Sequence, residues 1–279
     1  MPHHEQPPRP PDPLPIPVVD NHCHLDISRD EGPPAPVEEV LADAARVGVD
    51  RVVQVGCELG SAAWTVQVVE QHPAVLGGVA IHPNGAPGLY EAGALDDACD
   101  RIEEYAAHPR VRVIGESGLD YYRTGPEGVH AQQESFRRHI EIAKRTGRAL
   151  QIHDRDAHDD VLRILAEEGA PERTVLHCFS GDMAMARECV RRGYFLSFAG
   201  TVTFKNARDL RNALAVVPTE HLLVETDAPY LTPSPHRGRT NGPYLVPLTV
   251  RAMSETLNSS VPALCAALSA NSESVYGPW

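Results

Sequence analysis

Lysine is scarce in this 279-residue chain, which contains only Lys144 and Lys205. No apolar run approaches the roughly 20 residues of a membrane span, so we expect no membrane contact. No G-x-G-x-x-G segment follows an apolar run, which removes the usual reason to predict a dinucleotide-binding sheet. The six cysteines include no C-x-x-C pair, and the chain is too long for a disulfide scaffold. We therefore expect reduced thiols in a cytoplasmic protein.

Positively charged residues are also fewer than negatively charged ones. The chain has 25 lysines and arginines against 38 aspartates and glutamates, a formal net charge of −13. So acidic a protein does not coat nucleic acid by bulk electrostatics, and any contact with DNA must be local. The first residues contain no cationic segment followed by an apolar core, so we expect no signal peptide. Residues 1–17 are proline-rich and predict a disordered tail before one folded domain, residues 18–279.

What the chain does contain is a repeated pattern, in which a short β-branched run leads into a stretch with helical spacing. The predicted strands lie near residues 18–19, 52–55, 76–81, 111–114, 149–153, 174–177, 194–198 and 222–225. The predicted helices cover residues 37–47, 61–71, 95–107, 130–146, 161–168, 184–192, 207–216, 248–257 and 262–268. Eight strand–helix units predict an α/β fold, a single-domain (β/α)8 TIM barrel. A doubly wound open sheet is the structural alternative.

Two histidines follow the first β-branched run with one residue between them. In an extended chain, residues i and i+2 point to the same side, so His22 and His24 can aim both imidazoles at one point. Neutral imidazole is a common ligand of zinc, iron and manganese. A packed or surface-exposed pair of histidines is the alternative reading of this short motif.

Residues with metal-binding side chains also end other predicted strands. The carboxyl ends of all strands in a TIM barrel meet on one rim, which carries the active site. Two ions about 3.5–4 Å apart can activate a water and stabilise the leaving oxygen of a phosphate ester. We predict a site for two divalent ions (Mg²⁺, Mn²⁺ or Zn²⁺), with Glu116 and Asp227 as catalytic carboxylates. The predicted ligands are His22, His24, Glu116, His153, His177 and Asp227.

The shortage of lysine bears on how two ions would be bridged. Many barrel hydrolases use a carboxylated lysine on the fourth strand for this purpose. Neither Lys144 nor Lys205 lies at the end of that strand in this chain. We therefore predict that Glu116, the residue with ligand chemistry at this position, bridges the two ions.

Several separate motifs together resemble one family. The segments HCHLD, GESGLDYYR, IHDRDAH, LHCFSG, SFAGTVTFKNA and ETDAPYL, in this order, resemble the TatD-type metal-dependent deoxyribonucleases. The resemblance extends over about residues 18–277. It implies a TIM barrel, a divalent-metal site and hydrolysis of DNA phosphodiesters, often as a 3′→5′ exonuclease on single strands. The same six ligands follow from it, and His82 is expected near the substrate phosphate.

Further residues on the expected rim could bind the substrate. Arg123 follows the fourth strand, and the loop 235–243 retains Arg237 and Asn241 of the family pattern. Two loop positions depart from that pattern, because Thr240 and Gly242 stand where the family usually has a basic and an acidic residue. We expect short or single-stranded DNA ends as substrate and no obligate protein partner.

Two other functions compete with the nuclease. A metal-dependent amidohydrolase or lactonase acting on a small molecule would use similar ions, but it predicts a closed apolar pocket and no use for arginines on the rim. A barrel without enzymatic activity would be expected to have lost at least one ligand position, and none is lost. Glu225 shares a face with Asp227 and could accept a hydrogen bond from a ligand histidine.

Overall fold

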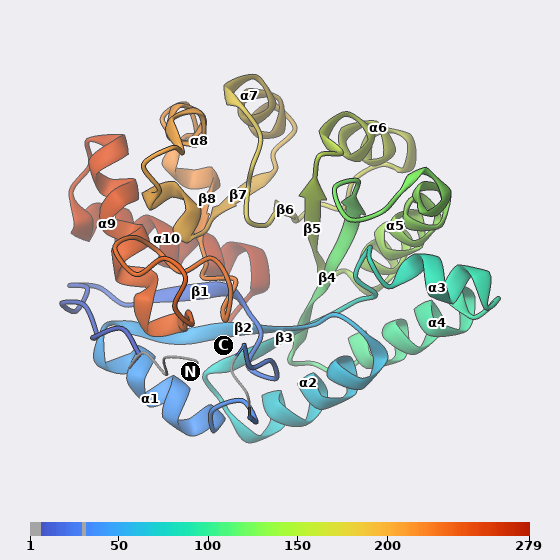
Figure 1. Cartoon of the computed structure of the whole chain (residues 1–279), viewed down its shortest axis with the longest axis horizontal. Coiled ribbons are helices and arrows are strands. Elements are labelled where there is room, and N and C mark those ends of the chain that lie inside the picture. Colours follow the sequence, from blue (N-terminus) through green and yellow to red (C-terminus); the bar gives the residue numbers. More distant parts are fainter. Residues whose placement is uncertain (1–6, 30–31) are drawn as a thin grey trace, which may run out of the picture.

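The structure, a computed structural model, describes residues 7–29 and 32–279. Within these residues, eight parallel strands form one sheet in the order β1 to β8, with helices around it (Figure 1). The (β/α)8 barrel predicted from the sequence is confirmed. The strands are β1 (Val18–Cys23), β2 (Val49–Gly56), β3 (Val75–Val79), β4 (Val111–Asp120), β5 (Ala149–Arg155), β6 (Thr174–Leu176), β7 (Phe195–Phe198) and β8 (Leu222–Val224).

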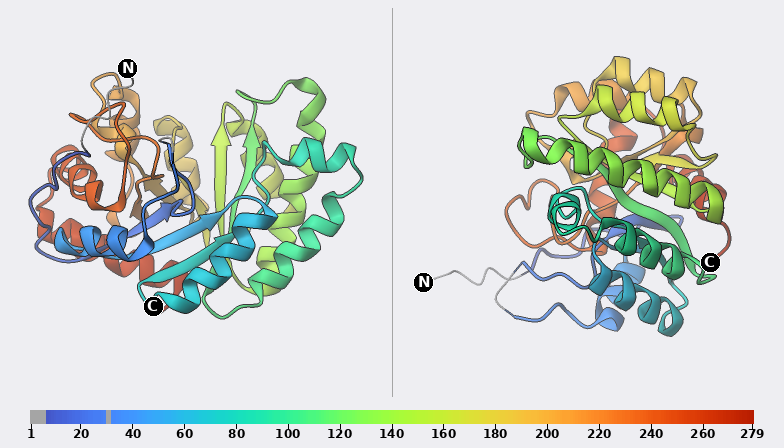
Figure 2. Two further views of the ribbon diagram at one scale, coloured as in Figure 1. Left: turned by 60° about the horizontal axis from the view of Figure 1, so that its bottom comes forward. Right: turned by 90° about the vertical axis from the view of Figure 1, so that its right-hand side faces the viewer.

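Helices cover the outer face of the strands, as both side views show (Figure 2). The α-helices are α1 (Val37–Arg46), α2 (Leu59–Gln71), α3 (Ala86–Glu91), α4 (Leu95–Ala106), α5 (Pro126–Thr146), α6 (His158–Glu168), α7 (Met183–Arg191), α8 (Arg208–Leu214), α9 (Val246–Leu257) and α10 (Val261–Tyr276). Three short 3₁₀ helices are η1 (Gly200–Thr203), η2 (Thr219–His221) and η3 (Pro243–Leu245). The short helix α3 was not predicted from the sequence.

Helix α5 illustrates how local sequence sets the bounds of an element. Pro126 occupies its first turn, where a missing N–H costs nothing, and Glu127 places negative charge at the positive end of the helix dipole. Gly147 ends the helix with a left-handed backbone, φ 63°. The predicted end is confirmed, whereas the helix begins four residues before the predicted start at residue 130.

The ends of the sheet meet at β1 and β8. A parallel bridge joins Cys23 to Ala228 just beyond the end of β8. The backbone N–H of Asp227 donates to the carbonyl of His22 at 2.9 Å, and that of His24 donates to the carbonyl of Ala228 at 2.7 Å. These contacts bring the first and last predicted ligands of the chain next to each other, although about 200 residues separate them in sequence.

Alternate residues of β2 belong to different parts of the core. Val53 and Val55 are buried in a cluster that includes Tyr276 of α10, while Val52 packs in another with residues of α1 and α2. Helix α10 was predicted to end at Leu268 but continues to residue 276. The apolar periodicity fades after Leu268, but one side of the added turns is buried, including Val275 and Tyr276, and Tyr276 packs against the interior strands.

The segment before β1 lies against the barrel. Leu14 is buried, and its N–H donates to the carbonyl of Val47 at 2.9 Å. The Arg251 guanidinium holds the carbonyl of Asp12 at 2.8 Å. Part of the predicted tail therefore contacts the barrel, through Leu14 and the carbonyl of Asp12. Residues 1–6 of the predicted tail lie outside the described residues, and the domain boundary at residue 18 stays a prediction.

In the part of the chain that the structure describes, every helix is too short or too polar to cross a lipid bilayer. The cytoplasmic location expected from the sequence stays a prediction.

Candidate metal centre

His22 is fully buried within β1, and a hydrogen bond with Gln151 determines which of its ring nitrogens carries a proton. Gln151 donates from its amide nitrogen to the carbonyl of Asn21 at 2.8 Å, and the same nitrogen lies 2.8 Å from the Tyr276 hydroxyl. The Gln151 oxygen therefore faces Nδ1 of His22, at 2.8 Å, and accepts a hydrogen bond from its N–H. This leaves Nε2 of His22 bare, without a hydrogen-bond partner among residues 7–29 and 32–279.

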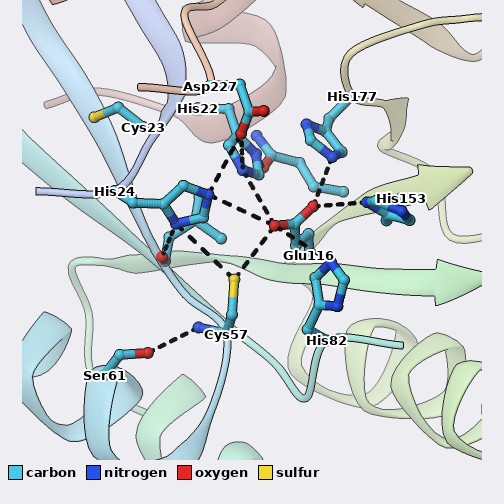
Figure 3. A network of polar contacts seen from close by, with 12 residues as sticks. His22, Cys23, His24, Cys57, Ser61, His82, Glu116, His153, His177 and Asp227 are labelled. Carbon is cyan, nitrogen blue, oxygen red and sulfur yellow. Dashed lines mark hydrogen bonds and ion pairs between the residues drawn. The ribbon is translucent and has the colours of Figure 1, made fainter. Parts of the chain in front are cut away.

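His24 follows β1 directly and is oriented in the same manner. Its Nδ1 lies 2.9 Å from the carbonyl oxygen of Val55, which can only accept, so Nδ1 carries the proton. Its Nε2 lies 3.6 Å from Oε1 of Glu116 and 3.4 Å from Oδ1 of Asp227. Both histidines of the H-x-H motif thus direct Nε2 at the same two carboxylates (Figure 3).

His22, His24 and Asp227 form a cluster of the size of one ion, and Glu116 lies beside both histidines. His22 Nε2 lies 3.7 Å from Glu116 Oε1 and 3.9 Å from Asp227 Oδ1. A tetrahedral ion with ligands at about 2.0–2.1 Å keeps its ligand atoms about 3.4 Å apart. The observed separations of 3.4–3.9 Å come close to this value. Imidazole nitrogens and carboxylate oxygens are also donors that suit divalent ions.

The second oxygen of Glu116 faces a different pair of histidines. Glu116 Oε2 lies 2.6 Å from Nε2 of His177 and 3.1 Å from Nδ1 of His153 (Figure 3). Glu116 lies within β4, because this strand continues to Asp120, beyond the end predicted at residue 114. One carboxylate therefore touches two donor groups, one with each oxygen.

Two further carboxylates hold the second pair of histidines. Asp120 lies 3.1 Å from Nε2 of His153, and Glu225 lies 3.1 Å from Nδ1 of His177.

Between Glu116 and Asp120, strand β4 passes very close to β5. A Cβ atom on Gly118 would lie 2.1 Å from the carbonyl oxygen of His153, and its φ of 145° also favours glycine. The glycine in GESGLD lets these two strands approach.

Electrostatics at the centre are governed by burial and by the histidine–carboxylate contacts. Burial opposes a charge on Glu116, but the positive charge of His177 outweighs it and holds the pKa of Glu116 well below its usual range. Burial likewise opposes a charge on His177, but Glu116 and Glu225 raise its pKa well above the usual value. Burial lowers the pKa of His82 to about 4, so this ring is neutral at pH 7.

A cavity of about 520 Å³ opens onto the centre. His82 lines it, with its Nε2 at 3.9 Å from Glu116 Oε1. Arg123 and Arg155 also line the cavity, and the Arg155 guanidinium stacks on the ring of Tyr122 at 3.9 Å. The ring of Tyr230, 40% exposed, lies at the cavity 6.4 Å from that of His24. Cations and an aromatic face thus surround the carboxylate-rich centre.

Two predicted substrate-binding residues lie elsewhere. The exposed Arg237 places its guanidinium over the ring of Phe204 at 4.0 Å and does not line this cavity in the described residues. Asn241 is buried, and its amide donates to the carbonyls of Thr226 and Tyr230 at 3.0 and 2.6 Å. Its geometry is that of a residue that orders the loop after β8. Each side chain is engaged by its own neighbours, and the substrate-binding roles of both residues stay predictions.

The structure brings together the side chains of all six predicted ligands, along with His82 and Arg123 near them. It also reveals residues that the sequence reasoning missed. Gln151 precedes His153 by two residues and Asp120 follows Glu116 by four, so even spacing on a strand could have indicated both. No sequence signal indicated the third, Cys57, which follows β2 and contacts Glu116 and His24.

Comparison with known proteins identifies the family. The family described as TatD related DNase matches residues 19–277 of this chain. A Mycobacterium tuberculosis relative, named as an uncharacterized metal-dependent hydrolase TatD, is 46% identical over 266 residues, covering 93% of this chain and 98% of that protein. The chain belongs to the TatD family of metal-dependent hydrolases. The resemblance seen in the motifs is thereby confirmed.

Other TatD-family members agree in sequence and in structure. The Escherichia coli hydrolase YcfH, named as an uncharacterized metal-dependent hydrolase, is 40% identical over 230 residues, 82% of this chain and 84% of that protein. The crystal structure of the TatD homolog YJJV from Escherichia coli superposes with a TM-score of 0.85 at 25% identity, covering 94% of this chain and 98% of that one. The bare, buried Nε2 of His22 and the donor cage around it fit the metal dependence of the family.

Proposed function

We propose that this protein hydrolyses phosphodiester bonds of DNA, removing nucleotides from the 3′ end of single strands with two divalent ions. The observation that carries the proposal is the divided contact of Glu116. Its Oε1 faces the cage of His22, His24 and Asp227, and its Oε2 faces His177 and His153. This is the arrangement expected of a carboxylate that bridges two ions.

The proposed ligands divide into two groups that share Glu116. His22, His24 and Asp227 would hold the first ion, and His153 and His177 the second. When bound, such ions lower the pKa of a water ligand towards 7 and offset the charge of a phosphate. The carboxylates of Asp120 and Glu225 hold the outer ring nitrogens of the second pair, which orients these rings and increases their basicity.

Asp227 and His82 would accept a proton from the attacking water and stabilise the charge on the phosphate, respectively. Asp227 is the more exposed of the two carboxylates, with 16% of its side chain accessible against 6% for Glu116. It can take the proton of the attacking water at the open side of the centre. Nδ1 of the neutral His82 accepts from the N–H of Asn84 at 3.0 Å, so its Nε2 carries the proton. That N–H can donate to a phosphate oxygen that gains charge.

The cavity lining favours a phosphodiester over a neutral substrate. Arg123 and Arg155 line the same cavity as the carboxylate cluster, and a guanidinium group is a suitable partner for a phosphate. Tyr230 offers an exposed ring on which a base could stack. A net charge of −13 repels long duplex DNA from the rest of the surface, which favours short or single-stranded ends.

The test is a nuclease assay on oligonucleotides labelled at the 5′ end, with Mg²⁺ or Mn²⁺ and with or without chelator. We expect a ladder of products shortened from the 3′ end, slower loss of blunt duplex and no product with chelator. A matched substrate with phosphorothioate linkages at its 3′ end should resist. The Glu116→Ala variant is the control for contaminating nucleases.

A panel of lactones and amides, assayed in parallel, tests the rival function. Chelator-sensitive turnover of one of these compounds, with intact DNA under every divalent ion, would overturn the nuclease proposal in favour of a small-molecule hydrolase.

A further inference from the structure

A cysteine thiol lies inside the candidate metal centre. Sγ of Cys57 is 3.3 Å from Oε1 of Glu116 and 3.9 Å from Nδ1 of His24 (Figure 3). The sulfur, one oxygen of Glu116 and one ring nitrogen of His24 all lie within 4.8 Å of one another. Because Nδ1 of His24 donates to the carbonyl of Val55, Nε2 of this ring is the nitrogen that could bind a single ion together with the sulfur and Oε1 of Glu116.

The backbone of Cys57 is fixed on both sides, which sets where the thiol lies. Its N–H donates to the hydroxyl of Ser61 at 2.8 Å, in the first turn of α2. Its carbonyl accepts from the N–H of His82 at 2.9 Å, in the segment after β3. These two hydrogen bonds hold the residue at the rim between β2 and β3, beside the carboxylate of Glu116.

A second, independent observation points to an ion at the same carboxylate oxygen. Nε2 of His22, fully buried, is without a partner in the described part of the chain and lies 3.7 Å from Glu116 Oε1. A buried nitrogen of this kind is rarely left bare, and an ion would satisfy it. The thiol of Cys57 contacts this same oxygen from another direction.

Donor chemistry then indicates which ion the thiol favours. Thiolates bind soft or borderline ions such as zinc, whereas magnesium and manganese prefer oxygen donors. We propose that Cys57 is a further ligand of the ion held by His24 and Glu116, and that it makes this centre select zinc or cadmium over magnesium. On coordination the S–H bond breaks, the sulfur lone pair binds the ion and the proton leaves to solvent. The inference rests on the proposed function in taking His24 and Glu116 as ligands.

The alternative is that Cys57 only positions Glu116. Burial raises the pKa of the Cys57 thiol to about 12, so without an ion it is neutral and donates its S–H to the carboxylate. A thiol with this role alone would keep its proton when the ion binds. The two roles therefore differ in whether a metal–sulfur bond forms.

Titration of the full-length protein with Cd²⁺ and with Co²⁺ tests this directly, because thiolate ligation produces a charge-transfer absorption in the ultraviolet. We expect this band in the wild type and its loss in Cys57→Ser. Calorimetry should show Cd²⁺ bound at least about tenfold more weakly by Cys57→Ser, since even indirect partners of a ligand contribute about 10–100-fold. Mg²⁺ affinity should change much less.

Cys178→Ser is the matched control. Cys178 follows His177 and lines the same cavity, but it belongs to none of the metal-sized clusters among the described residues. This variant should keep the band and the Cd²⁺ affinity. Circular dichroism verifies folding, and Cys57→Ala replaces Cys57→Ser if serine perturbs the fold.

Different failures have different meanings. Cd²⁺ bound by the wild type without a charge-transfer band, or an unchanged ratio of Cd²⁺ to Mg²⁺ affinity in Cys57→Ser, would overturn the role of Cys57 and leave the metal centre standing. Absence of divalent-ion binding by the wild type would overturn the metal centre and, with it, the inference.

Discussion

The side-chain oxygen of Gln151 accepts a hydrogen bond from Nδ1 of His22 at 2.8 Å. Strand β5 thereby fixes the tautomer of a candidate ligand on β1, 129 residues earlier in the chain. The amide nitrogen of Gln151 is held in turn by the carbonyl of Asn21 and the hydroxyl of Tyr276. A residue at the end of α10 thus supports the centre through two hydrogen bonds in series.

Replacement of Gln151 should weaken metal binding without removing a ligand. Gln151→Met has a similar volume but leaves Nδ1 of His22 without an acceptor, so we expect affinity for Zn²⁺ or Mn²⁺ to fall by about 10–100-fold. Competition with a fluorescent chelator measures this. Tyr276→Phe removes only the outer hydrogen bond and should have a smaller effect. Wild-type affinity in Gln151→Met would show that the tautomer is fixed by other means.

Replacement of Glu116 should affect both donor groups at once. Glu116→Ala removes both oxygens, and we expect the variant to lose at least one of two ions and nearly all hydrolysis while the barrel stays folded. Metal analysis, circular dichroism and the nuclease assay on the same sample measure the three properties. Glu116→Gln, which retains one oxygen donor, is the control and should keep more metal than Glu116→Ala. Full metal occupancy with normal activity in Glu116→Ala would contradict a bridging role.

Metal affinity should rise with pH. Burial disfavours the charged form of His177, but Glu116 and Glu225 outweigh it and raise its pKa well above the ordinary value. An ion must therefore displace a proton from Nε2 below that raised pKa, and the competition ends above it. We expect affinity to increase about tenfold per pH unit for each proton released. Calorimetry in buffers of different ionisation enthalpy counts these protons, and Glu225→Gln should lower the count.

Asp20 should make folding stability depend on pH. Its carboxylate is buried against Thr226, at 2.9 Å from the backbone N–H and 2.5 Å from the hydroxyl, and burial raises its pKa to about 7. A folded-state pKa above the unfolded value of 3.8 means that the native state binds the extra proton. Stability contributed by this group is therefore largest at low pH, falls by about 1.4 kcal/mol per pH unit between the two values, and levels off above pH 7.

Asp20→Asn should remove this dependence, because an amide keeps an oxygen for the N–H of Thr226 and does not ionise. Urea denaturation of the metal-free protein at pH 5 and pH 8 measures it. We expect the free energy of unfolding of the wild type, relative to Asp20→Asn, to be higher at pH 5 than at pH 8. A difference that is the same at both pH values would show that Asp20 does not titrate in this range.

Arg123 and Arg237 should differ in their effects on DNA. Arg123 lines the cavity, whereas Arg237 stacks on Phe204 outside it. We expect Arg123→Ala to raise KM for single-stranded DNA and to reduce the salt dependence of binding by one phosphate contact, a change of about 0.7 in the logarithmic slope. Arg237→Ala should change both much less. Equal effects of the two substitutions would indicate that the loop 235–243 moves towards bound DNA.

Most of the barrel follows from local sequence. Short β-branched runs alternate with helical spacing eight times, and Gly147 ends α5 where its conformational freedom predicts. Two of the boundaries that failed share one cause, which is tertiary burial. Strand β4 continues to Asp120 because it pairs with β5 through residue 155, and α10 continues to Tyr276 because the interior of the barrel buries its last turns.

The sequence by itself determined the residue types at the strand ends, since the alternation of side chains along a strand and the position after it are local properties. Only the tertiary structure decided which of those side chains contact one another. Closure of the barrel put Cys57 and His24 on the same oxygen of Glu116, and it set Gln151 behind His22. Closure of the barrel also placed the Arg237 guanidinium over the ring of Phe204. These contacts join strands far apart in the chain, and their geometry depends on how the strands stagger around the barrel, which no local pattern encodes.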